Sequence, residues 1–241
     1  MTFQLLRLQP DTKALSVWAI RNGVLSPDGD YGYALHGLFS AAFGEKVPKP
    51  FRYLGGRQGL LAYTEVGLDV LRMNASLAMP DVARILRLND FDAREFPIAW
   101  KKGQILGFEV RVRPVVRAKD GRERDAFLHA IGDMPAEENV GMSQRTRIYG
   151  EWLSKQFLAD DAASIIEVQM DAFSLTRVLR KAGSRENGKR KACTVTGPDV
   201  IFKGRMKVGN SEGFARLLTR GVGRHRAFGF GMLLLKPASF C

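Results

Sequence analysis

Cysteine and histidine are scarce in this sequence, which contains two cysteines and three histidines in 241 residues. Cys193 and Cys241 are too few to form a disulfide framework, and their spacing is not that of a metal site. No histidine lies at metal-ligand spacing from another histidine or from a carboxylate cluster. These absences argue against a structural zinc site and a disulfide-stabilised domain. We expect no bound metal and no other cofactor.

Long apolar runs are missing as well. No stretch of about 18 apolar residues occurs, so no segment is expected to span a bilayer. The N-terminal segment MTFQLLRLQPD lacks the basic region, the long apolar region and the small-residue cleavage site of a signal peptide. Together with the few cysteines, these absences predict a reducing, cytoplasmic location.

Two common enzyme motifs are also absent. No Gly-x-Ser-x-Gly elbow occurs, and the glycine-rich stretch Gly221–Gly231 is not followed by Gly-Lys-Ser/Thr. That stretch lies between a predicted helix and a predicted strand, the reverse of the order in a dinucleotide-binding fingerprint. Two interpretations remain, a helix end followed by a tight turn, or a backbone that approaches a phosphodiester closely. The residues concerned are Gly221, Gly223, Arg224, His225 and Arg226.

Positive charge, by contrast, is abundant. Lysine and arginine number 37 against 25 aspartate and glutamate, a formal net charge of +12. Such an excess favours a polyanionic partner, and nucleic acid is the leading candidate. Runs of charge are often only solvated surfaces, but here they fall on predicted strand edges and loops. The candidate nucleic-acid contacts are Arg111, Arg113, Arg117, Arg180, Lys181, Arg185, Lys189 and Arg190.

Hydrophobic periodicity predicts the same order of elements in both halves, strand-helix-strand-strand-helix-strand. This order suits two tandem ferredoxin-like (RRM-like) α+β domains, which we expect to span residues 1–96 and 97–241. The predicted strands are Thr2–Leu8, part of Ala62–Asn74, Phe108–Val112, Ser164–Leu179, Lys191–Val208 and the last apolar stretch. The predicted helices are Tyr31–Phe43 with Asp30 as its cap, Met79–Leu88, and two helices capped by Ser143 and Ser211.

One histidine stands in a suggestive position on the helix predicted at Tyr31–Phe43. Leu35, Leu38 and Phe39 recur at helical spacing and define its buried stripe. His36 is rotated by about 100° from Leu35 around the helix axis, so it lies outside that stripe. Tyr33 precedes it by three residues, so the two side chains share a surface of the helix. A purely structural histidine is the alternative interpretation.

This pair suits chemistry on RNA. RNA carries its own nucleophile, the 2′-hydroxyl, so a protein needs only to align it, transfer protons and neutralise charge. Histidine titrates near neutral pH and serves proton transfer well. We therefore take His36 and Tyr33 as candidate catalytic residues.

Four stretches together resemble a known family. These are YALH on the first helix, FEVRVRPVVR on a strand, VIFKGRMKVGNSEGFARLL before the glycine-rich stretch, and the ending GVGRHRAFGFGMLLLKP. The ending resembles the glycine-rich signature of the CRISPR repeat-processing endoribonucleases of the CasE (Cse3) type, part of the RAMP superfamily. Those proteins belong to type I-E antiviral defence systems.

The resemblance implies an activity and a partner. It implies binding of the CRISPR repeat hairpin and metal-independent cleavage of precursor crRNA at the 3′ base of the stem. The products would carry a 2′,3′-cyclic phosphate and a 5′-hydroxyl. The protein would then stay bound as a subunit of the Cascade complex, beside its backbone protein. A non-catalytic RNA-binding subunit on the same fold, or an RNA-binding module outside CRISPR, are the alternatives.

The resemblance also implies residue roles. His36 would transfer the proton, with Tyr33 as its partner. Relatives often place a lysine and a serine shortly after the histidine, where this chain has Ala41 and Gly44. We take Lys46 as the candidate cation. The segment from residue 11 to residue 29 is longer than the resemblance implies and has no predicted role.

Overall fold

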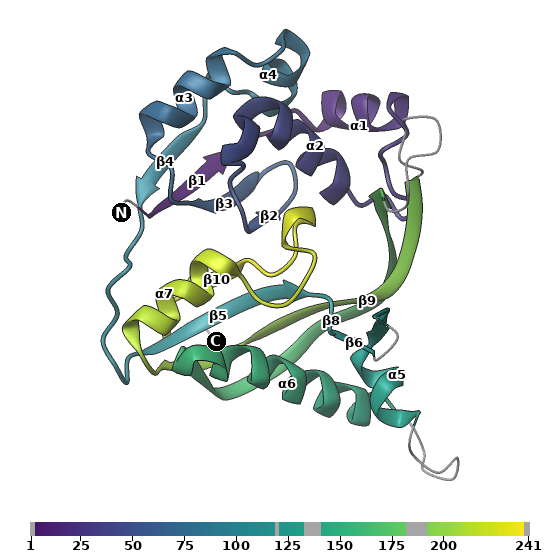
Figure 1. Cartoon of the computed structure of the whole chain (residues 1–241), viewed down its shortest axis with the longest axis vertical. Coiled ribbons are helices and arrows are strands. Elements are labelled where there is room, and N and C mark those ends of the chain that lie inside the picture. The colour runs from purple at the N-terminus through teal and green to yellow at the C-terminus, as the bar shows by residue number, and fades with distance from the viewer. Residues whose placement is uncertain (1–2, 119–120, 133–140, 182–191, 239–241) are drawn as a thin grey trace. The chain divides into compact units, whose positions relative to one another are not determined.

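The computed structural model describes residues 3–118, 121–132, 141–181 and 192–238. The chain forms two compact units (Figure 1). Unit 1 comprises Met1–Phe96, Thr176–Thr196 and Ala227–Gly229, and unit 2 comprises Pro97–Leu175, Gly197–Arg226 and Phe230–Cys241. Because two later segments join unit 1, a simple division into domains 1–96 and 97–241 stays a prediction.

Unit 1 contains a four-stranded antiparallel sheet with the order β2-β3-β1-β4. Its strands are β1 (Gln4–Leu8), β2 (Phe51–Tyr53), β3 (Leu60–Thr64) and β4 (Asp92–Glu95). Its helices are α1 (Thr12–Arg21), α2 (Gly32–Phe43), α3 (Leu68–Ser76) and α4 (Pro80–Leu86), with a short 3-10 turn η1 (Gly44–Lys46). The chain order and strand order are those of a ferredoxin-like fold, as predicted.

The predicted buried stripe of α2 is confirmed. Leu35, Leu38 and Phe39 are completely buried and pack into the core that α2 shares with the sheet. The ring of Phe39 lies 5.3 Å from that of Phe51 on β2. Each such side chain contributes about 1.5–3 kcal/mol through removal from water. The core therefore fixes which surface of α2 points away from it.

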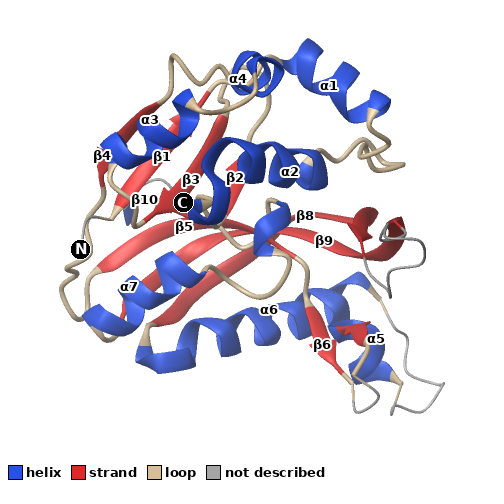
Figure 2. Ribbon diagram, turned by 45° about the horizontal axis from the view of Figure 1, so that its top comes forward, coloured by secondary structure: helices blue, strands red, loops and turns tan. Residues whose placement is uncertain are grey.

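The second four-stranded sheet repeats the pattern with the order β10-β5-β9-β8. Its strands are β5 (Ile105–Val112), β8 (Ala163–Lys181), β9 (Ala192–Val208) and β10 (Leu233–Lys236), and its helices are α6 (Met142–Leu158) and α7 (Ser211–Arg220). Figure 2 shows α5 (Ala126–Ile131) and β6 (Val115–Arg117) beside one end of α6. With β7 (Glu123–Asp125), they form an insertion between β5 and α6. The remaining 3-10 turns are η2 (Ala159–Asp161) and η3 (Arg226–Phe228). The predicted tandem of ferredoxin-like folds is thus present.

Two helices of unit 1 were not predicted. The strand expected in part of Ala62–Asn74 is present as the end of β3, but the rest of that stretch holds most of α3, in which Leu71 and Ala75 are buried one helical turn apart. Helix α1 was not predicted. Asp11 caps it by accepting from the backbone N–H of Ala14 at 2.9 Å.

Helix starts also shifted by one or two residues. Asn210, not Ser211, caps α7, since its side chain accepts from the N–H groups of Glu212 and Gly213. Helix α6 begins at Met142 with Gly141 as its cap rather than Ser143. Within the described ranges, no helix has the length and apolar character needed to cross a bilayer.

Candidate functional site

Three aromatic rings meet on the surface of α2 that faces away from the core stripe. The His36 ring lies 5.3 Å from the Phe228 ring at an interplanar angle of 84°. Tyr33 stacks on the same ring at 5.9 Å and 28°. Both helix residues are half-buried. Phe228 lies in Ala227–Gly229, the part of the glycine-rich stretch that belongs to unit 1. The predicted pair therefore has a third member that periodicity could not reveal.

A glycine allows this arrangement. A Cβ atom built on Gly32 would lie 2.2 Å from the carbonyl oxygen of Phe228, far inside van der Waals contact. Only glycine therefore lets the backbone at Phe228 lie directly on the first turn of α2. The ring of Phe228 is thereby held above His36 and Tyr33.

The surroundings of His36 favour its neutral form. Burial lowers the pKa of the imidazole below its ordinary value, and the positive charge of Lys49 lowers it further. Among the described residues neither ring nitrogen has a hydrogen-bond partner, and Nδ1 is shielded from solvent. Nε2 is then the nitrogen that a substrate can reach. An uncharged, unengaged imidazole at neutral pH is suited to accept a proton.

The two nearby lysines differ in their relation to His36. Lys46 is exposed in η1 and lines a hollow with Glu45, Asn74 and Leu77. Lys49, also exposed, is the cation whose charge acts on the imidazole. The role predicted for Lys46 stays a prediction, and Lys49 is a second candidate. Sequence reasoning missed Lys49 because only the fold brings it toward residue 36.

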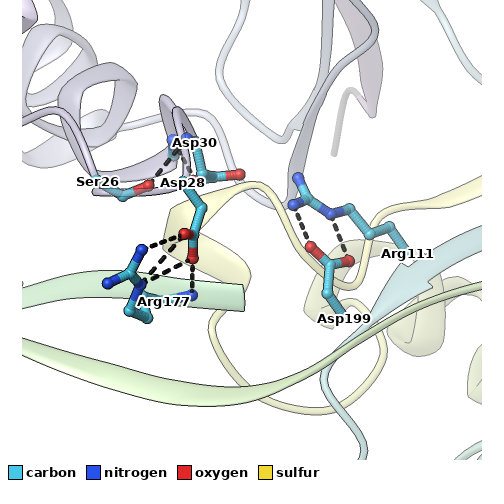
Figure 3. A network of polar contacts seen from close by, with 7 residues as sticks. Ser26, Asp28, Asp30, Arg111, Arg177 and Asp199 are labelled. Carbon is cyan, nitrogen blue, oxygen red and sulfur yellow. Dashed lines mark hydrogen bonds and ion pairs between the residues drawn. The ribbon is translucent and has the colours of Figure 1, made fainter. Parts of the chain in front are cut away.

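A hydrogen-bonded turn precedes α2 and is tied to β8 (Figure 3). Asp30 accepts from the Gly32 N–H at 2.8 Å, and its own N–H donates to Ser26 Oγ at 2.9 Å. Asp28 accepts from the Arg177 backbone N–H at 2.6 Å and from the Arg177 guanidinium at 2.7 Å. Hydrogen bonds from Arg177 lower the pKa of Asp28. This part of the segment from residue 11 to 29 thus anchors the start of the helix that carries His36.

Two of the predicted RNA contacts are engaged inside unit 2. Arg111 Nε donates to Asp199 at 2.8 Å, and its Nη2 makes a second bond to that carboxylate (Figure 3). The Arg111 guanidinium also lies over the Phe230 ring, 4.3 Å from the ring centre. Arg113 is 1% exposed and lies 5.5 Å from the centre of the same ring. This burial argues against direct phosphate contact by Arg113. The alternation of β5 was predicted correctly, and its Arg111 is partly buried and bound to a carboxylate.

The β6–β7 hairpin carries exposed arginines and one carboxylate that is bound to other residues. The exposed arginines are Arg117, Arg122 and Arg124. The carboxylate is Glu123, which binds two residues of the glycine-rich stretch. It accepts from Arg224 Nε at 2.6 Å and lies 2.9 Å from His225 Nε2. Arg117 therefore remains a candidate for phosphate contact, whereas His225 supports the loop.

The remaining loop residues have structural functions of their own. Arg226 Nη1 donates to the Arg220 carbonyl at 2.6 Å. Gly221 ends α7, with its N–H bonded to the Leu217 carbonyl at 2.8 Å and a φ of 76°. A Cβ on Gly223 would lie 2.7 Å from the Trp152 ring. These facts agree with a helix end followed by a tight turn, and backbone contact with a phosphate stays a prediction.

Comparison with known proteins decides the family. The model of a family described as CRISPR associated protein matches residues 4–237. The chain belongs to this CRISPR-associated family. It is also 30% identical over 147 residues to the CRISPR-associated endoribonuclease Cse3 of Thermus thermophilus, a match that spans 61% of this chain and 63% of that relative. The matched part is less than two thirds of the relative's length. The match supports the assignment to the CasE/Cse3 type.

Solved structures show the fold of this CRISPR-associated chain. A Thermus thermophilus Cse3 structure, bound to an RNA representing a pre-cleavage complex, covers 98% of the chain. It is matched over 100% of its own length at 19% identity, with a TM-score of 0.62. A chain of a CRISPR RNA-guided surveillance complex, pre-nicking, is also similar. The match covers 97% of this chain and 99% of that chain, at 14% identity and with a TM-score of 0.52.

Some predicted features of this family member lie beyond the described structure. The side chains of Arg180 and Lys181 fall outside it, as do Arg185, Lys189 and Arg190 entirely. Their RNA contacts stay predictions. The described residues contain no group of three or more His, Cys, Asp or Glu side chains placed to hold a metal ion. The metal independence of any cleavage stays a prediction.

Proposed function

We propose that this chain is a metal-independent endoribonuclease that binds the CRISPR repeat hairpin and cleaves precursor crRNA at the 3′ base of the stem. The observation that carries the proposal is His36, an imidazole with a lowered pKa and no hydrogen-bond partner among the described residues, beside Tyr33 and Phe228. The name of the Thermus relative, an endoribonuclease, supports it.

The reaction uses the RNA's own nucleophile. The 2′-hydroxyl 5′ of the scissile phosphate attacks phosphorus, forming the 2′-O–P bond as the P–O5′ bond breaks. His36 accepts the proton of the 2′-hydroxyl, and the leaving 5′-oxygen takes up a proton from solvent water. The products are a 2′,3′-cyclic phosphate and a 5′-hydroxyl. The lowered pKa of His36 favours this role as a base at neutral pH.

Tyr33 and a lysine assist the histidine. The Tyr33 ring is fixed by Phe228, so its hydroxyl can orient the 2′-hydroxyl or the phosphate. A cation stabilises the charge that develops on the phosphorane. Lys49 is the stronger candidate for this cation, because its charge acts on His36. Lys46, which the sequence suggested, is the second candidate.

After cleavage the protein remains on its product, in the cytoplasm, as a subunit of Cascade beside the backbone protein. The fold that it shares with a chain of a CRISPR RNA-guided surveillance complex supports this partner. Exposed residues such as Arg117 would contact phosphates of the hairpin stem, where the narrow major groove hinders reading of base edges.

Product analysis tests the proposal. The full chain is incubated with the repeat RNA of its own locus in excess EDTA, and the product ends are identified by mass spectrometry. Cleavage with a 2′,3′-cyclic phosphate and a 5′-hydroxyl is expected. Cleavage that requires a divalent ion, or leaves a 5′-phosphate, contradicts the mechanism. A chain that binds the hairpin without cutting it would be an RNA-binding subunit instead.

A further inference from the structure

The sheet of unit 1 has a second face that α2 does not cover. Strand residues alternate between faces, and Leu6, Leu8, Leu60, Ala62 and Phe51 point into the helix-covered core. The other face carries the intervening residues. In register across the four strands lie Arg52, Leu61, Arg7 and Asp92, and the next row holds Tyr63, Leu5 and Arg94.

A hollow of about 430 Å³ opens on this face. Its lining combines an apolar floor with polar walls, and consists of Leu5, Arg7, Leu54, Arg57, Gln58, Leu61, Asp92 and Arg94. The three arginines are exposed. Among the described residues, no carboxylate lies within ion-pair distance of any of the three. We refer to these eight residues as the basic hollow.

The second sheet shows that such an excess of charge is not a general property of this protein. On its face that carries Glu109, Lys203 pairs with Asp171 at 2.9 Å and Arg205 pairs with Glu167 at 2.6 Å. Lys236 pairs with Glu109 itself at 3.0 Å. That face neutralises each of these cations locally, whereas the basic hollow has three arginines and a single carboxylate.

We propose that the basic hollow binds a single-stranded segment of RNA that flanks the hairpin, an inference that rests on the proposed function. Arginine guanidinium groups bind phosphate in a fork geometry, and the leucine floor offers an apolar surface to an unstacked base. The Gln58 amide can both donate to and accept from a base edge. A duplex keeps its bases stacked and paired, so it would leave the floor unused.

Equilibrium binding tests the proposal. Three RNAs are tested for binding to the full chain over a range of salt: the repeat hairpin ending one nucleotide past the scissile phosphate (the bare hairpin), the hairpin with its single-stranded flanks, and the flanks alone. The two hairpin RNAs carry a 2′-deoxy nucleotide 5′ of the scissile phosphate, so that they stay uncut during the measurement. The wild type should bind the flanked hairpin about tenfold or more tightly than the bare one. The triple variant Arg7→Gln/Arg57→Gln/Arg94→Gln should lose that gain. Its salt slope on the flanked RNA should become shallower by about 2, since each single-strand phosphate contact contributes roughly 0.7.

A charge-matched control separates the site from net charge. The triple variant Arg147→Gln/Arg205→Gln/Arg216→Gln also removes three positive charges, each from an arginine already paired with a carboxylate. It should retain the gain from the flanks. Thermal melting of both variants confirms that they are folded.

The outcomes keep the two proposals apart. Equal affinity of the wild type for flanked and bare hairpins overturns the hollow as an RNA site. So does a basic-hollow variant that keeps the full gain, or a control variant that loses as much. The all-ribose form of the bare hairpin, which keeps one nucleotide past the scissile phosphate, should be cleaved by the wild type and by the basic-hollow variant at equal rates. If the wild type does not cut the bare hairpin, the proposed function fails, while the flank affinities still decide the hollow.

Discussion

At the scale of single residues, the account depends on how the surroundings of one imidazole set its charge. Burial and the Lys49 charge both disfavour the protonated form of His36. The imidazole therefore stays neutral at pH values where an ordinary histidine is partly charged. As a base it should remain active on the acid side of neutrality, which makes its pKa the quantity to measure.

Replacement of Lys49 should change that pKa in a known direction. Lys49→Met removes a positive charge that disfavours the imidazolium, so the pKa of His36 should rise. Lys46→Met is the matched control and should shift it less, because Lys49 is the charge that lowers the pKa of His36. NMR titration of the His36 ring protons, assigned with His36→Gln, measures both. An equal shift in the two variants would contradict this distinction.

The same pKa predicts how stability depends on pH. The native imidazole binds a proton less readily than the unfolded chain, in which it titrates near 6.5. Its contribution is therefore fully present above about pH 6.5 and is lost as the pH falls through and below that value. Between about pH 7.5 and pH 5.5, the denaturation midpoint of the wild type should fall more than that of His36→Gln. Parallel profiles would show that burial does not act on this group.

A pair of glycines on α2 tests the contact with Phe228. Gly32→Ala places a Cβ against the Phe228 carbonyl, so it should destabilise the fold by about 1–3 kcal/mol and slow cleavage. Gly37→Ala is the matched control, since its Cβ would meet only the Trp18 ring at an ordinary 3.8 Å. It should be neutral or stabilising through helix propensity. Urea denaturation and single-turnover cleavage of both variants decide the matter.

At the scale of elements, the turn before α2 connects the helix that carries His36 to β8. The Asp28 carboxylate receives both the backbone N–H and the guanidinium of Arg177. Asp30, two residues later, accepts from the N–H of Gly32, the first residue of α2, although Tyr31 rather than Asp30 is the residue at the cap position. We expect this connection to position α2, and with it Tyr33 and His36, rather than to take part in proton transfer.

Non-additivity tests the connection. Asp28→Asn and Arg177→Met should each slow single-turnover cleavage at saturating RNA, with the pH profile of the rate unchanged. The double variant should be hardly slower than either single variant, because both changes break one contact. Purely additive losses would mean that the two residues act separately.

Which elements could be predicted follows from where their information lies. The stripe of α2 and the alternation of β5 are local patterns, and both were predicted correctly. Helix α1 was not predicted, because only Leu15 and Ala19 are fully buried in it. The contacts of Arg111 could not be predicted, because Asp199 and Phe230 reach it from distant parts of the sequence.

At the scale of the whole molecule, the net charge of +12 predicts a polyanionic partner but not the residues that meet it. The structure divides the arginines into those bound to carboxylates, such as Arg111 and Arg224, and those without such a partner among the described residues, such as Arg57. His36 and Tyr33 could be proposed as a pair from the sequence, because helical spacing places both on one surface of the helix. Phe228 and Lys49 were not, because only tertiary structure brings them near.

Single-turnover cleavage by His36→Ala tests the central claim most directly. The repeat RNA is compared with a substrate that carries a 2′-deoxy nucleotide 5′ of the scissile phosphate, and hairpin affinity is measured in parallel. Loss of the proton-transfer group should slow cleavage by roughly 10²–10⁴-fold with affinity nearly unchanged, and Tyr33→Phe should cost less. The deoxy substrate should not be cut. Cleavage by His36→Ala at the wild-type rate would contradict the account and make this histidine a structural residue.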